Sequence, residues 1–335
     1  MNLKTIAKEA GVSTATVSNV INGNYHKVSQ GTIEKVQKII EENNYMPNAT
    51  ARSLASKKSQ IIGVIVPNVR EEGNFCINPY DAHLLAMLEK YIRNQGYYMM
   101  MRCVGKCSEI IPLFSSWNVD GTVLFGAFED EAADIQNNLE APAVFIDTYA
   151  EGLGIVNVGI DDYKGGYLSA TYLLGKGHRN IAFVGPDVTS PGVIQQRYQG
   201  FYNACAEKGI RITQEHIFKV NTLYQDGVIA GQKIAISEVP FTAVAVMSDI
   251  VAFGVIEGLR FCGRRVPEDI SVIGFDDLPE CCYSNPKLTT ISQKIEQKAL
   301  LAGECLFKKI RGEKLTSDSK RIDVEIVERQ SVRSI

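Results

Sequence analysis

The chain has 335 residues, of which 45% are hydrophobic and 22% charged, and its net charge is −3. This composition is typical of a globular protein with more than one domain and excludes an intrinsically disordered chain. No apolar stretch reaches the roughly 20 residues that span a bilayer, and a polar segment rather than a signal peptide follows Met1, so we expect a cytoplasmic protein without a membrane partner.

The charge is divided unevenly along the chain. Residues 1–60 contain eight Lys and Arg residues against four Asp and Glu residues, whereas the remaining chain contains 27 against 34. A positive field at one end of an acidic protein attracts a polyanion to that end only. The alternative is a solvated packing domain with ordinary lysines, which charge alone does not exclude.

The basic segment has the pattern of a helix–turn–helix. Apolar residues recur at helical spacing over residues 3–10, and Gly11 can adopt the left-handed conformation that ends a helix. Ser13 is placed to cap a second helix, and a third helix, opened by Ser29, carries apolar residues on one side. Three such helices bury a small core and leave the second helix free to enter a DNA major groove.

A short segment follows this headpiece. Pro47 interrupts the helical pattern, and Asn48 can cap a helix of two or three turns over residues 49–56. A helix of that length is marginal in isolation, so we expect it to form only when something stabilises it. Residues 57–59 are predicted to be a linker.

The remaining chain alternates between apolar runs and amphipathic stretches. This alternation predicts parallel sheets with helices on both faces, divided near Ile160 into two α/β halves with a ligand cleft between them. The expected strands are 61–66, 97–104, 121–125, 143–147, 181–185, 217–220, 243–247 and 270–275, and the expected helices lie near 80–95, 129–139, 163–176, 193–208, 227–237 and 250–262.

Motifs for catalysis are absent from the sequence. There is no Walker A, H-E-x-x-H or G-x-S-x-G pattern, and no G-x-G-x-x-G follows a strand. The eight cysteines are scattered without the spacing of a disulfide framework or a zinc site. We therefore expect neither an enzyme nor a cofactor or metal site.

Several stretches, in order along the whole chain, resemble the lactose/galactose-repressor (LacI/GalR) family of transcription regulators. Each stretch is short, and their order and spacing together make the resemblance specific. They are Ala10-Gly11-Val12-Ser13, Tyr45-Met46-Pro47-Asn48, Ala51-Arg52-Ser53-Leu54, Gly177-His178-Arg179, Arg197-Tyr198-Gln199-Gly200-Phe201, Gly274-Phe275-Asp276 and Leu288-Thr289-Thr290-Ile291.

The resemblance implies a fold class: an N-terminal all-α helix–turn–helix headpiece and an α/β body of two parallel-sheet subdomains, similar to periplasmic binding proteins. The headpiece and hinge helix would take residues 1–57, and the effector-binding and dimerisation domain residues 61–335. In that fold the chain crosses three times between subdomains. The first subdomain would take about 61–160 and 291–317, and the second about 161–290 and 320–335.

The resemblance also implies a function. Such a protein represses transcription as a homodimer, or a higher oligomer, on a palindromic operator in double-stranded DNA, and a small molecule in the cleft changes its affinity for the operator. A regulator that answers to a protein partner, or one that activates genes, is the alternative. A solute-binding protein would lack the headpiece, and an enzyme would need a catalytic constellation.

By family position, Thr14, Ala15 and Asn19 face base edges. Asn can read adenine, and Thr or Ala can touch a thymine methyl group. The family most often has Arg where this chain has Asn19, so we expect a shift toward an A·T pair there. Leu54 would wedge into the minor groove; packing within the hinge is its alternative. Phosphate contacts, with capping or solvation as the alternatives, are expected from Ser13, Thr16, Ser18, Asn22, Arg52 and Lys57.

Effector contacts are expected where strands end at the cleft. Asp147 and Asp276 end strands, and Arg197 lies near a helix start; an Arg197 salt bridge is the alternative. Asp249 is a further candidate at the cleft edge, although it could only cap a helix. In Asn78-Pro79-Tyr80-Asp81, Tyr80 could stack on a ligand and Asp81 could accept a hydroxyl or cap the helix. Carboxylates with one arginine and an aromatic ring suggest a sugar or related polyol.

Overall fold

The chain forms two compact units, residues Met1–Ser59 and Gln60–Ile335, which we call the headpiece and the body. The computed structural model describes residues 2–21, 23–43, 45, 58–67, 78–105, 118–126, 129–148, 154–189, 192–315, 317 and 319–335. The predicted hinge helix and the predicted DNA contacts of Asn22, Arg52, Leu54 and Lys57 lie outside these residues.

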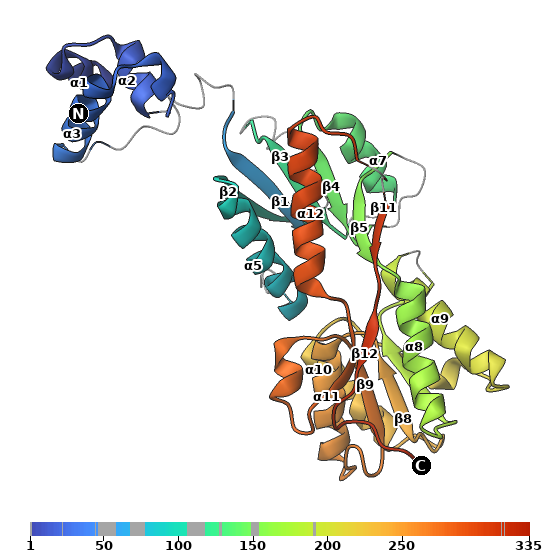
Figure 1. Cartoon of the computed structure of the whole chain (residues 1–335). Coiled ribbons are helices and arrows are strands. Elements are labelled where there is room, and N and C mark those ends of the chain that lie inside the picture. Colours follow the sequence, from blue (N-terminus) through green and yellow to red (C-terminus); the bar gives the residue numbers. More distant parts are fainter. Residues whose placement is uncertain are drawn as a thin grey trace. The chain divides into compact units, whose positions relative to one another are not determined.

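The headpiece contains the expected three helices (Figure 1). Gly11 has a φ of 69°, which confirms the left-handed residue predicted after the first helix. The N–H of Val12 then donates to the carbonyl of Ala7 at 2.9 Å and closes the helix end. The elements are α1 (Leu3–Ala10), α2 (Thr14–Ile21), a 3-10 turn η1 (Tyr25–Lys27) and α3 (Gln30–Glu42).

One small core holds these helices together. Ile6, Val17 and Val36, one from each helix, are fully buried against one another. Ala7 and Ala10 are buried in the same cluster, and their small side chains allow α1 to cross its neighbours closely.

The first sheet of the body is entirely parallel. Its strand order is β11-β5-β4-β3-β1-β2, so the edge strands are β11 and β2. The strands are β1 (Ile61–Pro67), β2 (Tyr98–Val104), β3 (Gly121–Phe125), β4 (Ala143–Ile146), β5 (Asn157–Ile160) and β11 (Ser319–Ile322).

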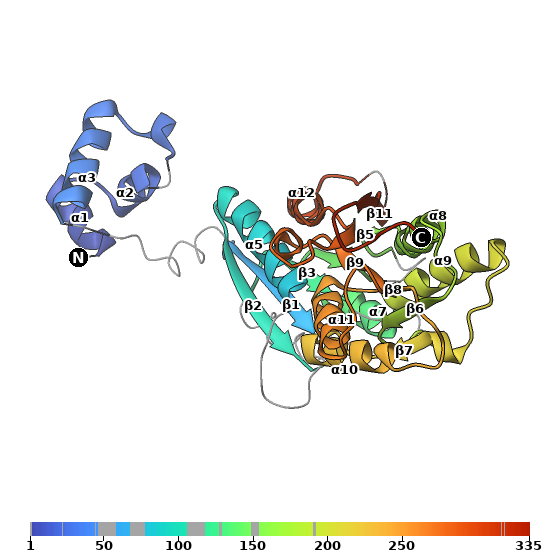
Figure 2. The same ribbon diagram turned by 90° about the horizontal axis from the view of Figure 1, so that it is seen from below.

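Helices cover both faces of this sheet. They are needed on both because successive side chains of a strand point to opposite faces and are apolar on each. Val144 belongs to the cluster that α5 (Pro79–Asn94) and α12 (Ile295–Ile310) help to form, whereas its neighbour Phe145 packs with α7 (Glu129–Asn138). Figures 1 and 2 show α5 beside β2 and α12 over the central strands.

The second sheet has the order β12-β10-β9-β8-β6-β7, and only the β10–β12 pair is antiparallel. Helices α8 and α9 pack together, as do α10 and α11 (Figure 2). The elements are β6 (Ile181–Gly185), β7 (Ile217–Lys219), β8 (Ala243–Val246), β9 (Ser271–Asp276), β10 (Thr289–Ser292), β12 (Glu325–Val327), α8 (Asp162–Gly175), α9 (Val193–Glu207), α10 (Tyr224–Ala235) and α11 (Asp249–Phe261).

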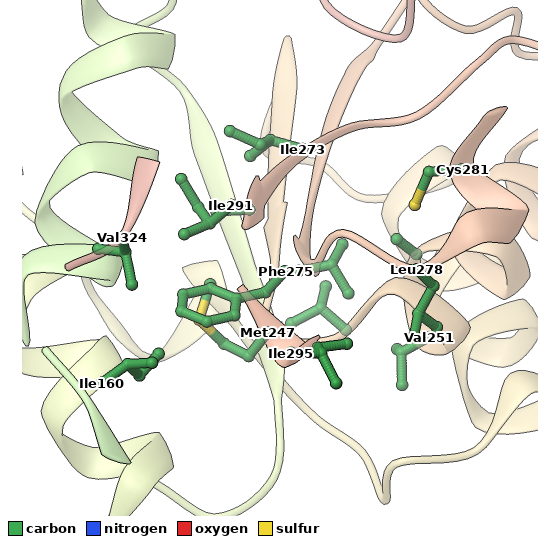
Figure 3. Packing of buried hydrophobic residues seen from close by; sticks show 14 of the residues in the cluster. Ile160, Met247, Val251, Ile273, Phe275, Leu278, Cys281, Ile291, Ile295 and Val324 are labelled. Carbon is green, nitrogen blue, oxygen red and sulfur yellow. The ribbon is translucent and has the colours of Figure 1, made fainter. Parts of the chain in front are cut away.

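Phe275 on β9 is central to the core of the second sheet. Its ring is fully buried, and Figure 3 shows it among Ile291, Met247 and Val324. A side chain at Gly165 of α8 would collide with this ring, so α8 lies directly on the sheet there. The adjacent Gly274 instead faces α11.

The chain crosses three times between the two lobes of the body, the lobes being the two sheets with their helices. It crosses after β5, after β10 and after β11. The expected boundaries need two corrections: residues 291–292 belong to β10 in the second sheet, and residues 320–322 belong to β11, which pairs with β5 in the first sheet. Among the described residues, none of the helices is long and apolar enough to cross a membrane.

Helices α8 and α9 touch backbone to backbone, and this contact can be tested. A methyl group at Gly200 would collide with the carbonyl oxygen of Tyr163. We expect Gly200→Ala to destabilise the body by about 1–3 kcal/mol through overpacking. The control is Gly175→Ala, at the open end of α8, where nothing lies within 4 Å of the added carbon; it should stabilise by about 0.5–1 kcal/mol. Urea unfolding of the full chain compares them, and equal stabilities would contradict the close contact.

Candidate functional site

The body contains a cavity of about 360 Å³ between its two lobes. Three strands of the two sheets end on it, because Asp147 follows β4, Ser248 follows β8 and Asp276 ends β9. The remaining lining comes mainly from other strand ends and from the first turns of α5 and α9. It comprises Asn78, Tyr80, Asp81, Phe125, Gly126, Ile146, Val193, Ile194, Arg197, Thr222, Met247, Ile250, Leu278 and Gln293.

A larger hollow of about 680 Å³ lies elsewhere, against β7 and α10. Exposed side chains such as Lys219, Asn221 and Ile229 form much of its lining. The smaller cavity is the better candidate, because buried charged groups such as Arg197 and Asp276 converge on it.

The wall from the first lobe begins at the start of α5. Asn78 caps the helix by accepting from the N–H of Asp81 at 2.8 Å, and its amide donates to the Asp81 carboxyl at 2.7 Å. Tyr80 donates its hydroxyl to Oδ2 of Asp147 at 2.7 Å. The cap is therefore Asn78, which corrects the capping role considered for Asp81; the Asp81 carboxyl accepts from the capping side chain and lines the cavity.

Asp81 is held in an environment that disfavours its charge. Burial raises the pKa of its carboxyl from 3.8 to about 7, and the negative charge of Asp147 adds to the rise. The hydrogen bond from Asn78 and the positive charge of Lys298 act in the opposite direction.

The wall from the second lobe contains Arg197, in the first turns of α9. Its Nε donates to Oδ1 of Asp162 at 2.8 Å and its NH1 group to the carbonyl of Met247 at 2.9 Å. The guanidinium also lies 3.7 Å from the centroid of the Phe275 ring. The salt bridge considered as the alternative for Arg197 is therefore present, while the side chain still lines the cavity.

Asp276 lines the cavity from the second lobe, whereas Asp147 lines it from the first. Gln293 donates its Nε2 to Oδ1 of Asp276 at 2.6 Å, and the N–H of Asp249 donates to Oδ2 at 3.3 Å. Burial and the neighbouring Asp249 raise the pKa of Asp276 to about 8, although Arg197 and Gln293 lower it.

Asp249 does not line the cavity, and this corrects the expectation that it contacts an effector. Its carboxylate accepts the hydroxyl of Thr290 at 2.6 Å, the N–H of Leu278 at 2.9 Å and the thiol of Cys281 at 3.0 Å. The side chain is fully buried and ties α11 to the chain after β9. The helix cap is Ser248, whose hydroxyl accepts from the N–H of Val251 at 3.4 Å.

The headpiece presents the expected base-reading residues on α2. Thr14 and Ala15 are exposed and Asn19 is half-buried. Ser13 caps the helix by accepting from the N–H of Thr16 at 3.1 Å, and the two hydroxyls are 2.9 Å apart. The capping alternative for Ser13 is thus observed, and the phosphate contacts of Ser13, Thr16 and the half-buried Ser18 stay predictions.

Sequence reasoning missed Gln293, which lines the cavity, and Lys298, which lies behind its lining. Gln293 follows the second-lobe strand that ends at Ser292, so its position at a strand end was a usable signal. Lys298 lies on α12 among the buried residues Ile295, Ala299 and Ala302, and a lysine in an apolar stripe was a second signal. Among the described residues, no group of three His, Cys, Asp or Glu side chains could hold a metal ion.

The chain matches two protein-family profiles. Residues 2–48 match the bacterial regulatory proteins of the lacI family, and residues 170–332 match a periplasmic binding protein-like domain. The ribose operon repressor of Haemophilus influenzae is 31% identical over 99% of both chains, and the transcriptional repressor PurR of Vibrio vulnificus is 32% identical over 99% of both.

Two solved structures are similar over most of the chain. The lac repressor dimer bound to operator and the anti-inducer ONPF has a TM-score of 0.89 at 24% identity, covering 100% of this chain and 99% of that one. A LacI family transcriptional regulator from Enterococcus faecium with bound ribose has a TM-score of 0.72 at 29% identity, covering 82% and 99%. The predicted fold class is therefore confirmed.

The raised pKa of Asp81 predicts a pH dependence of stability. The unfolded carboxyl ionises near 3.8 and the folded one near 7, so between these values the folded protein binds more protons and a rise in pH favours unfolding. We expect Asp81→Asn to flatten this decline, by up to about 1.4 kcal/mol per pH unit. Urea unfolding across this range is the measurement. The exposed Asp134 of α7 supplies the control, Asp134→Asn, and an identical slope in both variants would refute the prediction.

Proposed function

Because the chain belongs to the LacI family of bacterial transcription regulators, we propose that it is a repressor that binds a palindromic operator as a homodimer and responds to a small molecule in its cavity. Membership of the family makes it a DNA-binding regulator rather than an enzyme. The observation that carries the proposal is one chain with both a helix–turn–helix and a cavity lined by buried charged groups.

The DNA-binding part of the proposal rests on α2. Its exposed Thr14 and Ala15, with Asn19 one turn further on, form a surface that a major groove can accept. The family positions of Asn22, Arg52, Leu54 and Lys57 add phosphate and minor-groove contacts to the proposal. The positive charge of the first 60 residues supports the same use.

The homodimer is supported by apolar side chains on the surface of the body. Phe261 at the end of α11 is 67% exposed, and Tyr283 is 82% exposed. Their segments are neighbours, since Arg260 donates to the carbonyl of Asn285 at 2.7 Å. In the first lobe, Tyr98 on the edge strand β2 is 68% exposed. A second copy that covers these side chains would give a dimer with two headpieces, one for each half-site of a palindrome.

The effector part rests on the acceptor-rich lining. Asp81, Asp147 and Asp276 provide carboxylate oxygens, and the ring of Tyr80 provides an apolar surface. Such a lining suits a ligand with several hydroxyl donors, which favours a sugar or polyol. The similar regulator from Enterococcus faecium holds ribose, which supports the same class of ligand here.

The DNA contact can be tested with one amide. We expect Asn19→Ala to weaken binding to a duplex selected from a random pool by about 5- to 100-fold, because it removes a paired hydrogen bond to a base. Binding to unselected DNA should hardly change. Fluorescence anisotropy at several salt concentrations measures both affinities. Gln37→Ala, an exposed amide on α3, is the control. An equal loss on selected and unselected DNA would mean that Asn19 does not read a base.

The cavity can be tested with a ligand panel and one carboxylate. We expect ribose, glucose or cellobiose, at about 100 times its dissociation constant, to stabilise the full chain by about 2.7 kcal/mol and to change its affinity for the selected duplex. Asp276→Asn should abolish both effects. Asp226→Asn on α10, outside this cavity, should leave them unchanged. Calorimetry and anisotropy measure the two effects, and a normal response of Asp276→Asn would exclude this cavity.

A further inference from the structure

Lys298 is a buried charge that the proposed function does not use. It lies in the first turns of α12, and its side chain is 0% exposed. Burial of an ammonium group costs several kcal/mol unless nearby groups compensate its charge and bind its protons. The surroundings of Lys298 must therefore supply a negative charge and hydrogen-bond acceptors.

Three side chains surround the Lys298 ammonium group. Its Nζ lies 2.8 and 3.0 Å from the two carboxylate oxygens of Asp147, 2.7 Å from the Tyr80 hydroxyl and 2.8 Å from Oε1 of Gln293. An ammonium group has three protons, and these partners satisfy all of them. Lys298 itself does not line the cavity, but all three partners do.

These bonds continue into the second lobe. Because Oε1 of Gln293 accepts from Lys298, its Nε2 points the other way and donates to Asp276 at 2.6 Å. Asp147 follows a strand of the first sheet, and Asp276 ends a strand of the second. One lysine therefore connects the two carboxylates on opposite walls, through a glutamine in the segment between the lobes.

We propose that Lys298 is the positioning residue of the cavity, which fixes Tyr80, Asp147 and the Gln293 amide for a ligand and couples the two lobes when the ligand binds. This inference rests on the proposed function. A ligand that touches Asp147 and Asp276 contacts both ends of the same hydrogen-bonded chain. Lys298 thus acts through its hydrogen-bond partners. It determines how strongly a ligand contact with Asp147 in the first lobe affects Asp276 in the second lobe.

The test compares Lys298→Met with a control on the same helix. Methionine keeps an unbranched side chain that is one atom shorter than that of lysine, and it removes the charge. Lys309→Met removes a charge and a hydrogen bond of 2.9 Å to the carbonyl of Ala143, away from the cavity. A double variant, Lys298→Met with Asp147→Asn, removes both charges, so that one variant folds even if the uncompensated carboxylate unfolds the single one.

The first measurement needs no ligand. Asp81 interacts with Asn78 and Tyr80 at the start of α5, with Asp147 after β4, with Lys298 on α12 and with Cys103 of β2. The positive charge of Lys298 lowers the pKa of Asp81, so its loss should raise that pKa above about 7. Thermal unfolding of the full chain should then show Lys298→Met losing stability, relative to the parent, as the pH rises through 7. Lys309→Met should run parallel to the parent. A parallel profile for Lys298→Met would show a packing role only and overturn the proposal.

The second measurement uses ribose, glucose and cellobiose as probes in calorimetry. We expect Lys298→Met and the double variant to bind any probe that the parent binds about 10- to 100-fold more weakly. The reason is that the charge-assisted hydrogen bond between Lys298 and Asp147, which holds Asp147 in place, is lost. Lys309→Met should bind as the parent does, and unchanged binding by Lys298→Met would overturn the proposal. If no probe binds the parent, the proposed ligand class fails, and the pH profile alone decides the role of Lys298.

Discussion

The site depends on one geometric constraint: both sheets of the body direct carboxyl ends of parallel strands at the same cavity. All strands of a parallel sheet end at one edge, so residues that follow different strands meet there. Asp147 after β4 and Asp276 at the end of β9 are brought to one cavity in this way. A ligand bound to both carboxylates would contact both sheets, so its binding would depend on how the two lobes are placed.

The two buried cations near the cavity are stabilised differently. Arg197 rests on the Phe275 ring and pairs with Asp162, so its position depends on the close contact of α8 with α9 and with the core. Lys298 lies behind the opposite wall and pairs with Asp147. Each cation has its own carboxylate, whereas Asp81 and Asp276 keep raised pKa values because burial outweighs the positive charges nearby. The carboxyl groups thus differ in their surroundings: Asp147 pairs with a buried cation, whereas burial raises the pKa of Asp81 and Asp276.

Much of the fold could be predicted because its signals are local. Gly11 and the apolar spacing of the headpiece, and the apolar runs of the long strands, depend only on neighbouring residues. The short strands β5, β10 and β11 gave no long apolar run, and β11 joins the first sheet only through pairing with β5. In the site, strand ends located Asp147 and Asp276. The structural role of Asp249 and the pairing of Lys298 depend on partners distant in sequence, which no local pattern reveals.

The three crossings between the lobes have a further consequence. The first lobe is built from residues before β5 ends together with α12 and β11, while the second lobe takes β10 and β12 from the same final part of the chain. Neither lobe is therefore a contiguous stretch of polypeptide, and no single gene fragment encodes one of them alone. A single proteolytic cut at any crossing also leaves two covalent connections, so the two halves of the ligand site cannot be separated by one cleavage.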